Sequence, residues 1–427
     1  MKKLTIFLLT VIIYSNTLAQ NQASKLHELN SLLINTVMQD LFNPPVASRI
    51  YVYPNIAFYE CIATNKTQLQ SLSGKLNGLK PLPKPTNEID NEIAACISFC
   101  YTAQALVATE NKFEDWRNEY TKTTKLLLDS AIWINSFNYG KQIADSILAY
   151  SKTDNYLKSR SLMRYIITNK PGDWQPTPLD YAQGLEPNWN TIRPLTLSSP
   201  SQCSPNQKLV YSKSKKSVFY KTMMQTYRIG KNLDSIQKSI ALYWDDNPNV
   251  SNNIGHLNYF IHKISPGGHW IMITKQACEQ KNISIQKTAQ AYTLTAIAIF
   301  DGFISCWHEK YKTNLIRPIT ILNRDVDKNW QPYIQTPPFP EFTSGHSVTS
   351  NAAATVLTAL LGDNFSFEDK TEIPFGQGTR KFSSFNAASL ESSMSRVYGG
   401  IHYPETAKIS IEQGKAIGKN VLDKLVY

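Results

Sequence analysis

Segments with the periodicity of amphipathic or buried helices cover most of this 427-residue sequence, and the alternation typical of strands is sparse. The pattern argues against a large sheet and predicts an all-α fold built from helical bundles. The helices are expected at Lys25–Leu41, Ala47–Lys66, Glu88–Thr109, Lys122–Lys152, Ser217–Tyr243, Asn253–Ile264, Ile283–Trp307, Ser347–Leu361 and Glu405–Val426.

Proline-rich stretches mark the loops, and one of them, residues 193–207, is also rich in serine. We place the division between two packed helical units there. Residues 20–206 are expected to form an N-terminal helical unit, and residues 207–427 a C-terminal helical bundle. Each is long enough to bury a core of its own.

Residues 1–19 have the three parts of a secretory signal peptide. Lys2 and Lys3 form the basic start, residues 4–14 the apolar run, and Thr17-Leu18-Ala19 a cleavage site. We therefore expect the mature protein to be secreted or periplasmic.

The most apolar later segment, Thr288–Trp307, contains Asp301 and is followed by His308-Glu309-Lys310. A charged residue inside the run and charges directly after it are typical of a buried helix in a soluble protein. The chain is therefore not expected to span a membrane.

The formal net charge is +11, and the basic residues are scattered along the chain instead of clustered. This distribution argues against nucleic acid as a partner and favours an anionic small ligand or a generally basic surface. The six cysteines lack the spacing of a metal site. Export would permit disulfides, but buried free thiols agree equally well with the sequence.

The tripeptide Ile-Arg-Pro occurs twice, around Arg193 and around Arg317. Lys310 lies seven residues before Arg317, whereas Glu186 lies seven residues before Arg193. Seven helical residues make almost two turns, so Lys310 and Arg317 are expected on nearly the same face. Two cations side by side repel each other unless an anion lies between them. A solvated basic edge is the alternative.

The turn Ser344-Gly345-His346 leads directly into an apolar helix. The N–H groups and the dipole at a helix start favour an anion, and Gly345 allows its oxygens to approach the backbone closely. The alternative is that Ser344 only caps the helix and His346 faces solvent.

Arg396 precedes His402 by six positions, across the pair Gly399-Gly400. Adjacent glycines permit a tight backbone path that returns the imidazole toward the guanidinium. A surface turn with a capping histidine is the alternative for this stretch alone. Taken together, the three stretches predict three cations, a hydroxyl, an amide and two imidazoles around one oxyanion in the C-terminal bundle.

The three stretches, in this order and spacing, resemble the signature of the vanadium-dependent haloperoxidases and the type 2 phosphatidic acid phosphatases. The core of the resemblance covers about Asp301 to Thr406. Weaker upstream likeness points to the soluble bacterial haloperoxidase-like branch. It lies in Trp174-Gln175-Pro176-Thr177-Pro178, Pro187-Asn188-Trp189, Tyr243-Trp244-Asp245-Asp246 and Pro266-Gly267-Gly268-His269-Trp270.

The resemblance implies vanadate as the cofactor, in a site that phosphate can also occupy. His402 would coordinate vanadium, and His346 would contact the axial oxygen and manage protons. The remaining oxygens would be bound by Lys310, Arg317, Ser344, the Gly345 amide and Arg396. Trp307 and Phe339 match aromatic positions that shape the halide side of the pocket, with ordinary core packing as the alternative.

The implied reaction is the oxidation of halide, iodide or bromide, by hydrogen peroxide to hypohalous acid. Phosphate and vanadate are near-isosteric, so a phosphatase that hydrolyses phosphomonoesters through a phosphohistidine at His402 is the alternative. A non-catalytic anion-binding protein is a third hypothesis, and it requires a vestigial pocket. Asp245 or Asp246 could pair with an arginine of the site, or simply form a turn.

The sequence departs from the phosphatase pattern at Thr406. That pattern has an aspartate four residues after the last histidine, where it would orient the imidazole and raise its basicity. Vanadate coordination by His402 needs only that its other ring N–H be satisfied, which a backbone carbonyl can do. The departure therefore counts modestly against phosphohistidine chemistry.

Overall fold

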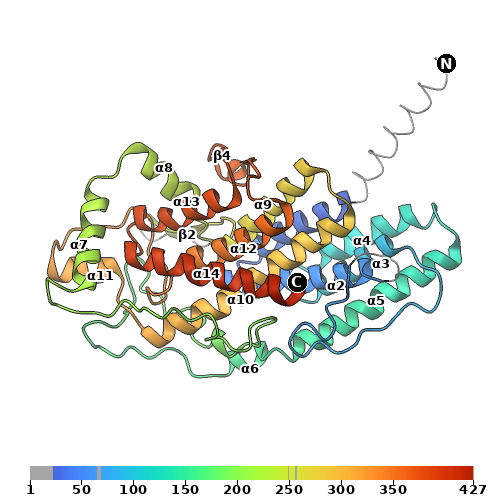
Figure 1. The fold of residues 1–427 in the computed structure, drawn as a ribbon, viewed down its shortest axis with the longest axis horizontal. Coiled ribbons are helices and arrows are strands. Elements are labelled where there is room, and N and C mark those ends of the chain that lie inside the picture. The colour runs from blue at the N-terminus through green and yellow to red at the C-terminus, as the bar shows by residue number, and fades with distance from the viewer. Residues whose placement is uncertain (1–22, 65–68, 249, 255–256, 427) are drawn as a thin grey trace, which may run out of the picture.

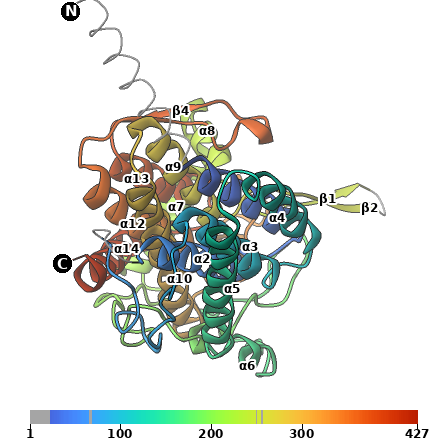
Figure 2. The same ribbon diagram turned by 90° about the vertical axis from the view of Figure 1, so that its right-hand side faces the viewer.

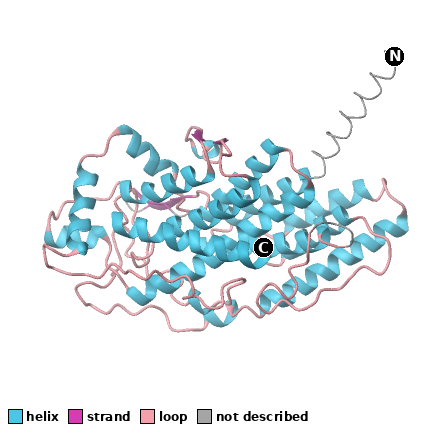
Figure 3. Ribbon diagram, in the orientation of Figure 1, coloured by secondary structure: helices cyan, strands magenta, loops and turns pink. Residues whose placement is uncertain are grey.

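The computed structural model describes residues 23–64, 69–248, 250–254 and 257–426 (Figure 1). The predicted all-α fold is confirmed, because helices make up most of the described chain and the strands are short (Figure 3). The signal peptide predicted at residues 1–19 lies outside the described residues. The division into units at residues 206 and 207 stays a prediction.

The elements follow one another along the chain with mostly short connections. Residues 23–39 are helical. The later helices are α2 (Pro44–Ile62), α3 (Asn91–Gln104), α4 (Asn111–Thr124), α5 (Ser130–Lys152), α6 (Tyr156–Arg160), α7 (Val218–Lys231), α8 (Ser235–Tyr243), α9 (Pro266–Lys281), α10 (Ile285–Thr313), α11 (Pro318–Asp325), α12 (Gly345–Leu361), α13 (Phe385–Tyr398) and α14 (Pro404–Leu425). Two 3₁₀ turns are η1 (Trp189–Thr191) and η2 (Ile373–Phe375).

One predicted helix, Asn253–Ile264, is wrong. The chain there forms an antiparallel pair, β1 (Val250–Ile254) with β2 (Leu257–Ile261), which projects from the helical body in Figure 2. Strand β1 contains Ser251, Asn252 and Asn253, and serine and asparagine are residue types that compete with the helical backbone for hydrogen bonds. A second pair, β3 (Phe367–Asp369) with β4 (Arg380–Phe382), joins α12 to α13.

Two other predicted helices are each divided by an aspartate cap. The predicted range Lys122–Lys152 is broken where Asp129 accepts hydrogen bonds from the first amides of α5. The range Ser217–Tyr243 is broken at Asp234, which forms a capping box with Gln237 at the start of α8. A side-chain acceptor at such a position ends one helix and begins the next, although the apolar periodicity continues.

Helix α10 forms the core of the molecule and packs against α2, α9, α12 and α14 (Figure 1). It is the one helix of the described chain that is long and apolar enough to cross a membrane, and 94% of that stretch is buried inside the protein. Asp301 on α10 accepts hydrogen bonds from the backbone N–H groups of Leu195 and Thr196 at 2.7 and 2.8 Å. These bonds bind the proline- and serine-rich segment directly to the core.

All six cysteines are free, and only Cys203 is not fully buried. Their burial agrees with the alternative of structural thiols.

Helix α14 lies unusually close to α12, because glycines face the contact. A Cβ atom on Gly414 would lie 2.4 Å from the Val348 carbonyl oxygen, and one on Gly418 would lie 2.7 Å from that of Ala352. The glycines therefore let the two backbones touch. Since α12 begins with Gly345 and His346, this contact helps to fix the position of the candidate site.

We expect the substitution Gly414→Ala to lower the free energy of unfolding by about 2 kcal/mol, because the added methyl group forces the two helices apart. Denaturant unfolding followed by circular dichroism measures the change. Gly378→Ala is the matched control, since a Cβ atom there meets nothing within 4 Å. Equal stability of the two variants would contradict the close approach of α12 and α14.

Candidate active site

The candidate residues lie at the ends of five helices that meet at one end of α10. Lys310 is in the last turn of α10, Arg317 precedes the first residue of α11, and Arg396 is in the last turn of α13. Gly345 begins α12, and His402 comes two residues before α14. Helix termini leave unpaired backbone groups, and here those groups surround the side chains of the site.

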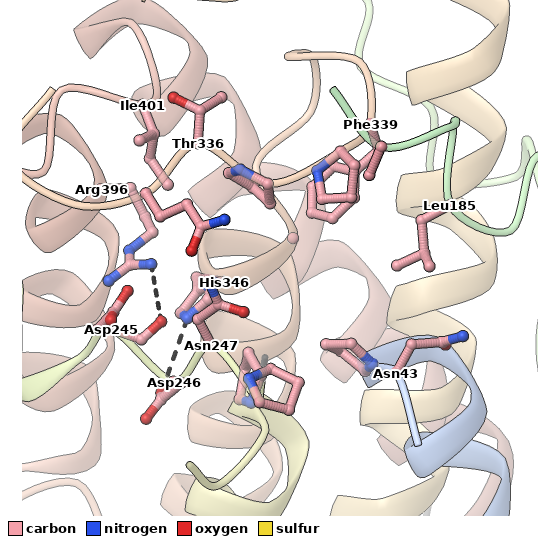
Figure 4. A pocket seen from close by; sticks show the side chains of 18 of the residues that line it. Asn43, Leu185, Asp245, Asp246, Asn247, Thr336, Phe339, His346, Arg396 and Ile401 are labelled. Atoms are coloured by element: carbon pink, nitrogen blue, oxygen red, sulfur yellow. Dashed lines mark hydrogen bonds and ion pairs between the residues drawn. The ribbon is translucent and has the colours of Figure 1, made fainter. Parts of the chain in front are cut away.

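A cavity of about 470 Å³ opens beside these residues. Gly345, His346, Arg396 and His402 line it, whereas Lys310 and Arg317 are fully buried behind its wall. Figure 4 shows Arg396, His346 and Asp246 on one side and Leu185 and Asn43 on the other. The rest of the wall is largely apolar and contains Phe303, Trp307, Phe339, Pro44, Pro178, Pro248, Pro266, Pro337 and Pro338.

His402 is held between a cation and a carboxylate. Its Nε2 lies 3.2 Å from Nη1 of Arg317, and its Nδ1 lies 2.8 Å from Oε1 of Glu341. A guanidinium can only donate, so Nε2 is the acceptor and Nδ1 carries the proton that Glu341 accepts. Burial and the nearby Arg317 hold the pKa of His402 well below its usual range. The ring is therefore neutral, with a lone pair on Nε2.

Glu341 is a site residue that the sequence reasoning missed. Its Oε1 also accepts a hydrogen bond from the Tyr403 amide at 3.0 Å, and its Oε2 accepts one from the Thr406 hydroxyl at 2.8 Å. The carboxylate expected four residues after the histidine is thus supplied from Glu341, and Thr406 holds it in place. Burial raises the pKa of Glu341 to about 7, although Arg317 opposes the shift.

Lys310 binds the loop that leads to α12. Its ammonium donates to the carbonyl oxygens of Pro340 at 2.9 Å, Glu341 at 3.2 Å and Thr343. These three bonds use all three of its N–H donors. Burial, and then the neighbouring Arg317, lower the pKa of Lys310 to about 7.

Arg396 attaches α13 to the segment that follows α8. Its guanidinium donates to the carbonyl oxygens of Trp244 and Asp245, the latter at 3.2 Å. The contact expected from Asp245 is therefore made by its backbone. Its carboxylate accepts instead from Lys263 at 3.1 Å.

His346 projects into the cavity near Asp246, with 3.8 Å between its Nε2 and Oδ2 of the aspartate. Burial and the cation of Arg396 hold its pKa well below the usual range. The imidazole is therefore neutral at physiological pH and can accept a proton. The alternative that His346 simply faces solvent is wrong.

The turn at Ser344 serves the helix as well as the site. The Ser344 hydroxyl accepts hydrogen bonds from the amide and hydroxyl of Ser347 at 3.4 and 2.9 Å, which makes it the cap of α12. The amides of Gly345 and His346 have no acceptor within the helix. A Cβ atom on Gly345 would lie 3.5 Å from the Trp307 ring, so glycine leaves the space beside these amides open.

The Phe339 ring contacts the two fully buried cations, Lys310 and Arg317. The Lys310 ammonium is 4.8 Å, and the Arg317 guanidinium carbon 5.0 Å, from the centre of its ring. The Trp307 ring is 4.9 Å from that of Phe339. Both aromatic side chains line the cavity and also pack in the core, and their part in a halide pocket stays a prediction.

The site has the chemistry of a receptor for a multiply charged anion. Among the described residues, none of the three cations donates a hydrogen bond to a carboxylate. Nη2 of Arg317 and Nε2 of His346 are buried without a hydrogen-bond partner in the described part of the chain. Buried polar and charged groups that lack a hydrogen-bond partner are costly, so these groups fit a bound tetrahedral oxyanion such as vanadate.

The chain is similar to known proteins over most of its length. Residues 290–426 match a family model described as the VCPO second helical-bundle domain. A structure of the first bacterial vanadium-dependent iodoperoxidase aligns with a TM-score of 0.89 and 40% identity, over 94% of this chain and 96% of that chain. The holo form of a bacterial vanadium-dependent chloroperoxidase has a TM-score of 0.69 at 15% identity, over 90% and 93% of the two chains. None of the curated proteins matches the sequence.

The contact between Glu341 and His402 predicts that Glu341→Gln weakens the binding of some anions and leaves that of others unchanged. An anion that bonds to the imidazole loses about 10- to 100-fold in affinity, because the ring becomes less basic. An anion held by the cations alone keeps its affinity. Titration calorimetry should therefore show weaker binding of orthovanadate and unchanged binding of inorganic phosphate, with Glu405→Gln altering neither. Equal losses for both anions would assign Glu341 a structural role only.

The lowered pKa of Lys310 predicts that oxyanion binding is coupled to proton uptake. Above pH 7 the ammonium of the free protein loses its proton, and a bound anion restores it. The apparent affinity should thus fall as the pH rises, by up to about tenfold per pH unit. Calorimetry at pH 8, in buffers of different ionisation enthalpy, measures the number of protons taken up when the anion binds. The original protein should take up about one more proton than Lys310→Met. Identical proton uptake by the two proteins would refute the coupling.

Proposed function

The chain belongs to the vanadium-dependent haloperoxidase family, and on this basis we propose that it oxidises iodide with hydrogen peroxide. Its cofactor is vanadate. The observation that carries the proposal is the set of three buried cations that donate to backbone carbonyls, with no hydrogen bond to a carboxylate among the described residues, beside a neutral, carboxylate-bound histidine.

The proposed cofactor site combines residues that line the cavity with Lys310 and Arg317, which are buried behind its wall. Nε2 of His402 would hold the metal, since Glu341 keeps the proton of the ring on the other nitrogen, Nδ1. Arg317, Arg396 and the amide at Gly345 would supply hydrogen-bond donors for the oxygens, and Lys310, whose N–H groups are bonded to the loop, would supply positive charge. When bound, vanadate supplies a Lewis acid that activates peroxide for oxygen transfer to halide.

His346 is the proposed acid–base residue. It lines the cavity, its low pKa keeps it neutral, and Nε2 has no hydrogen-bond partner among the described residues. It can therefore take a proton from an incoming peroxide and return it to a leaving oxygen. Asp246, 3.8 Å away, stabilises the ring when it is charged.

The apolar wall supports iodide as the preferred halide. Phe303, Trp307 and Phe339 offer ring surfaces instead of hydrogen-bond donors, so a halide must lose much of its hydration to enter. Iodide is the largest and most weakly hydrated common halide, and it is also the easiest to oxidise. The name of the iodoperoxidase, at 40% identity, supports the same choice.

The contacts of Glu341 also favour a second activity, the hydrolysis of phosphomonoesters. An imidazole oriented by a carboxylate is what phosphohistidine chemistry requires, and the sequence alone did not indicate such a group.

The localisation is likewise a proposal: the signal-like residues 1–19 favour a secreted or periplasmic enzyme.

Two histidine variants test the assignment. His402→Ala should lose vanadate binding and with it iodide oxidation. His346→Ala should still bind vanadate but oxidise iodide about 10²- to 10⁴-fold more slowly. The assay follows triiodide absorbance with vanadate, peroxide and iodide, and His308→Ala, outside the cavity lining, is the control.

Parallel assays with bromide, chloride and p-nitrophenyl phosphate complete this experiment. The proposal expects iodide to be oxidised fastest, and expects phosphatase activity only without vanadate. Full iodide oxidation by His402→Ala, or phosphate ester hydrolysis with no halide oxidation at all, would overturn the haloperoxidase assignment.

A further inference from the structure

A second buried polar cluster lies directly behind the proposed acid–base residue. It consists of His269 on α9, Asp246 after α8, Asp369 on β3 and Glu372 at the start of the following turn. All four side chains are buried, with at most 2% of each residue exposed. No step of the proposed reaction uses His269, Asp369 or Glu372.

The two nitrogens of His269 face different carboxylates. Nδ1 lies 2.9 Å from Oδ1 of Asp246, and Nε2 lies 2.8 Å from Oδ2 of Asp369. Asp369 is itself fixed by the hydroxyl and amide of Thr371, at 2.6 and 3.0 Å. A firmly held carboxylate on one nitrogen of an imidazole is the usual arrangement when the other nitrogen binds a metal ion.

Glu372 is the feature that the protein alone leaves unexplained. Both of its carboxylate oxygens are buried without a hydrogen-bond partner among the described residues. Its Oε1 lies 3.9 Å from Nδ1 of His269, on the same side as Asp246. The nearby Lys263 bonds to Asp245, and Arg396 to backbone carbonyls. A buried carboxylate that accepts no hydrogen bond is costly, so a ligand of positive charge fits this position.

We propose that Asp246, His269 and Glu372 bind a divalent transition-metal cation, with Zn²⁺ as the best match. One ligand atom from each residue lies within 4.8 Å of the other two. Two tetrahedral ligands about 2.1 Å from an ion are about 3.4 Å apart, so Nδ1 of His269 and Oδ1 of Asp246, which are 2.9 Å apart, need to separate only slightly to admit the ion. One imidazole and two carboxylates suit Zn²⁺, whereas Ca²⁺ would need about six to eight oxygens.

The cation would act on the reaction only through Asp246. Oδ1 of that carboxylate faces His269, and Oδ2 faces His346 at 3.8 Å. A metal ion on the first oxygen draws negative charge away from the second. The metal site therefore goes beyond the proposed function, and its test needs neither vanadate nor halide.

The test measures metal binding by the untagged protein after dialysis against EDTA. Calorimetry with Zn²⁺, and separately with Mn²⁺ and Ca²⁺, should show one saturable Zn²⁺ site per chain. Glu372→Gln should weaken Zn²⁺ binding at least tenfold, whereas Glu368→Gln on the same strand-and-turn segment should bind like the original protein. Anomalous diffraction at the zinc edge should place the ion between the three side chains.

Thermal unfolding guards against a variant that merely fails to fold. Zn²⁺ should raise the Tm of the original protein and of Glu368→Gln but not that of Glu372→Gln, since a ligand stabilises only the state that binds it. The proposal is overturned if the dialysed protein takes up no Zn²⁺, or if Glu372→Gln binds it unchanged. In either case Glu372 is a buried neutral acid that holds its own proton.

Discussion

The burial of three cations without a carboxylate partner is the constraint on which this structure depends. Lys310, Arg317 and Arg396 are held by backbone carbonyls, which come from the loop before α12, the turn before α14 and the segment after α8. Carbonyl dipoles fix the positions of the charges without cancelling them. The helix ends must therefore converge for the cations to be tolerated, and the net positive charge remains available to an anion.

Glu341 links the two halves of this arrangement. It contacts His402, Tyr403 and Thr406 through its side chain, and its own carbonyl accepts from Lys310. One residue thereby fixes the tautomer of the histidine, the entry to α14 and the ammonium of the lysine. Thr406 occupies the position that carries a carboxylate in the phosphatase pattern. Its hydroxyl instead orients the carboxylate of Glu341.

Much of the fold and the site could be predicted from local sequence patterns. The spacing of Lys310 and Arg317 separated the two Ile-Arg-Pro copies, and Arg193 does pack elsewhere, over the Tyr150 ring. The expectation that Lys310 and Arg317 share one helix face was wrong, because α10 ends at Thr313 and Arg317 is the N-cap residue of α11. Glu341 was missed because it is 61 residues from its partner His402, a pairing that no local period reveals. The available signal was a glutamate within the apolar run from Phe339 to Phe342. The breaks at Asp129 and Asp234 could have been read from cap chemistry, whereas the β1–β2 pairing depends on the fold around it.

The proline-rich wall of the cavity has a consequence for the lifetime of the protein. Thiols, thioethers and phenols are the side chains that electrophilic halogen attacks fastest, and the described residues of the cavity lining include no cysteine, methionine or tyrosine. Six prolines occupy much of that surface and expose only saturated carbon and tertiary amides. If the enzyme releases hypohalous acid as proposed, the product meets a wall that it scarcely attacks, with Trp307 as the most vulnerable ring in its path.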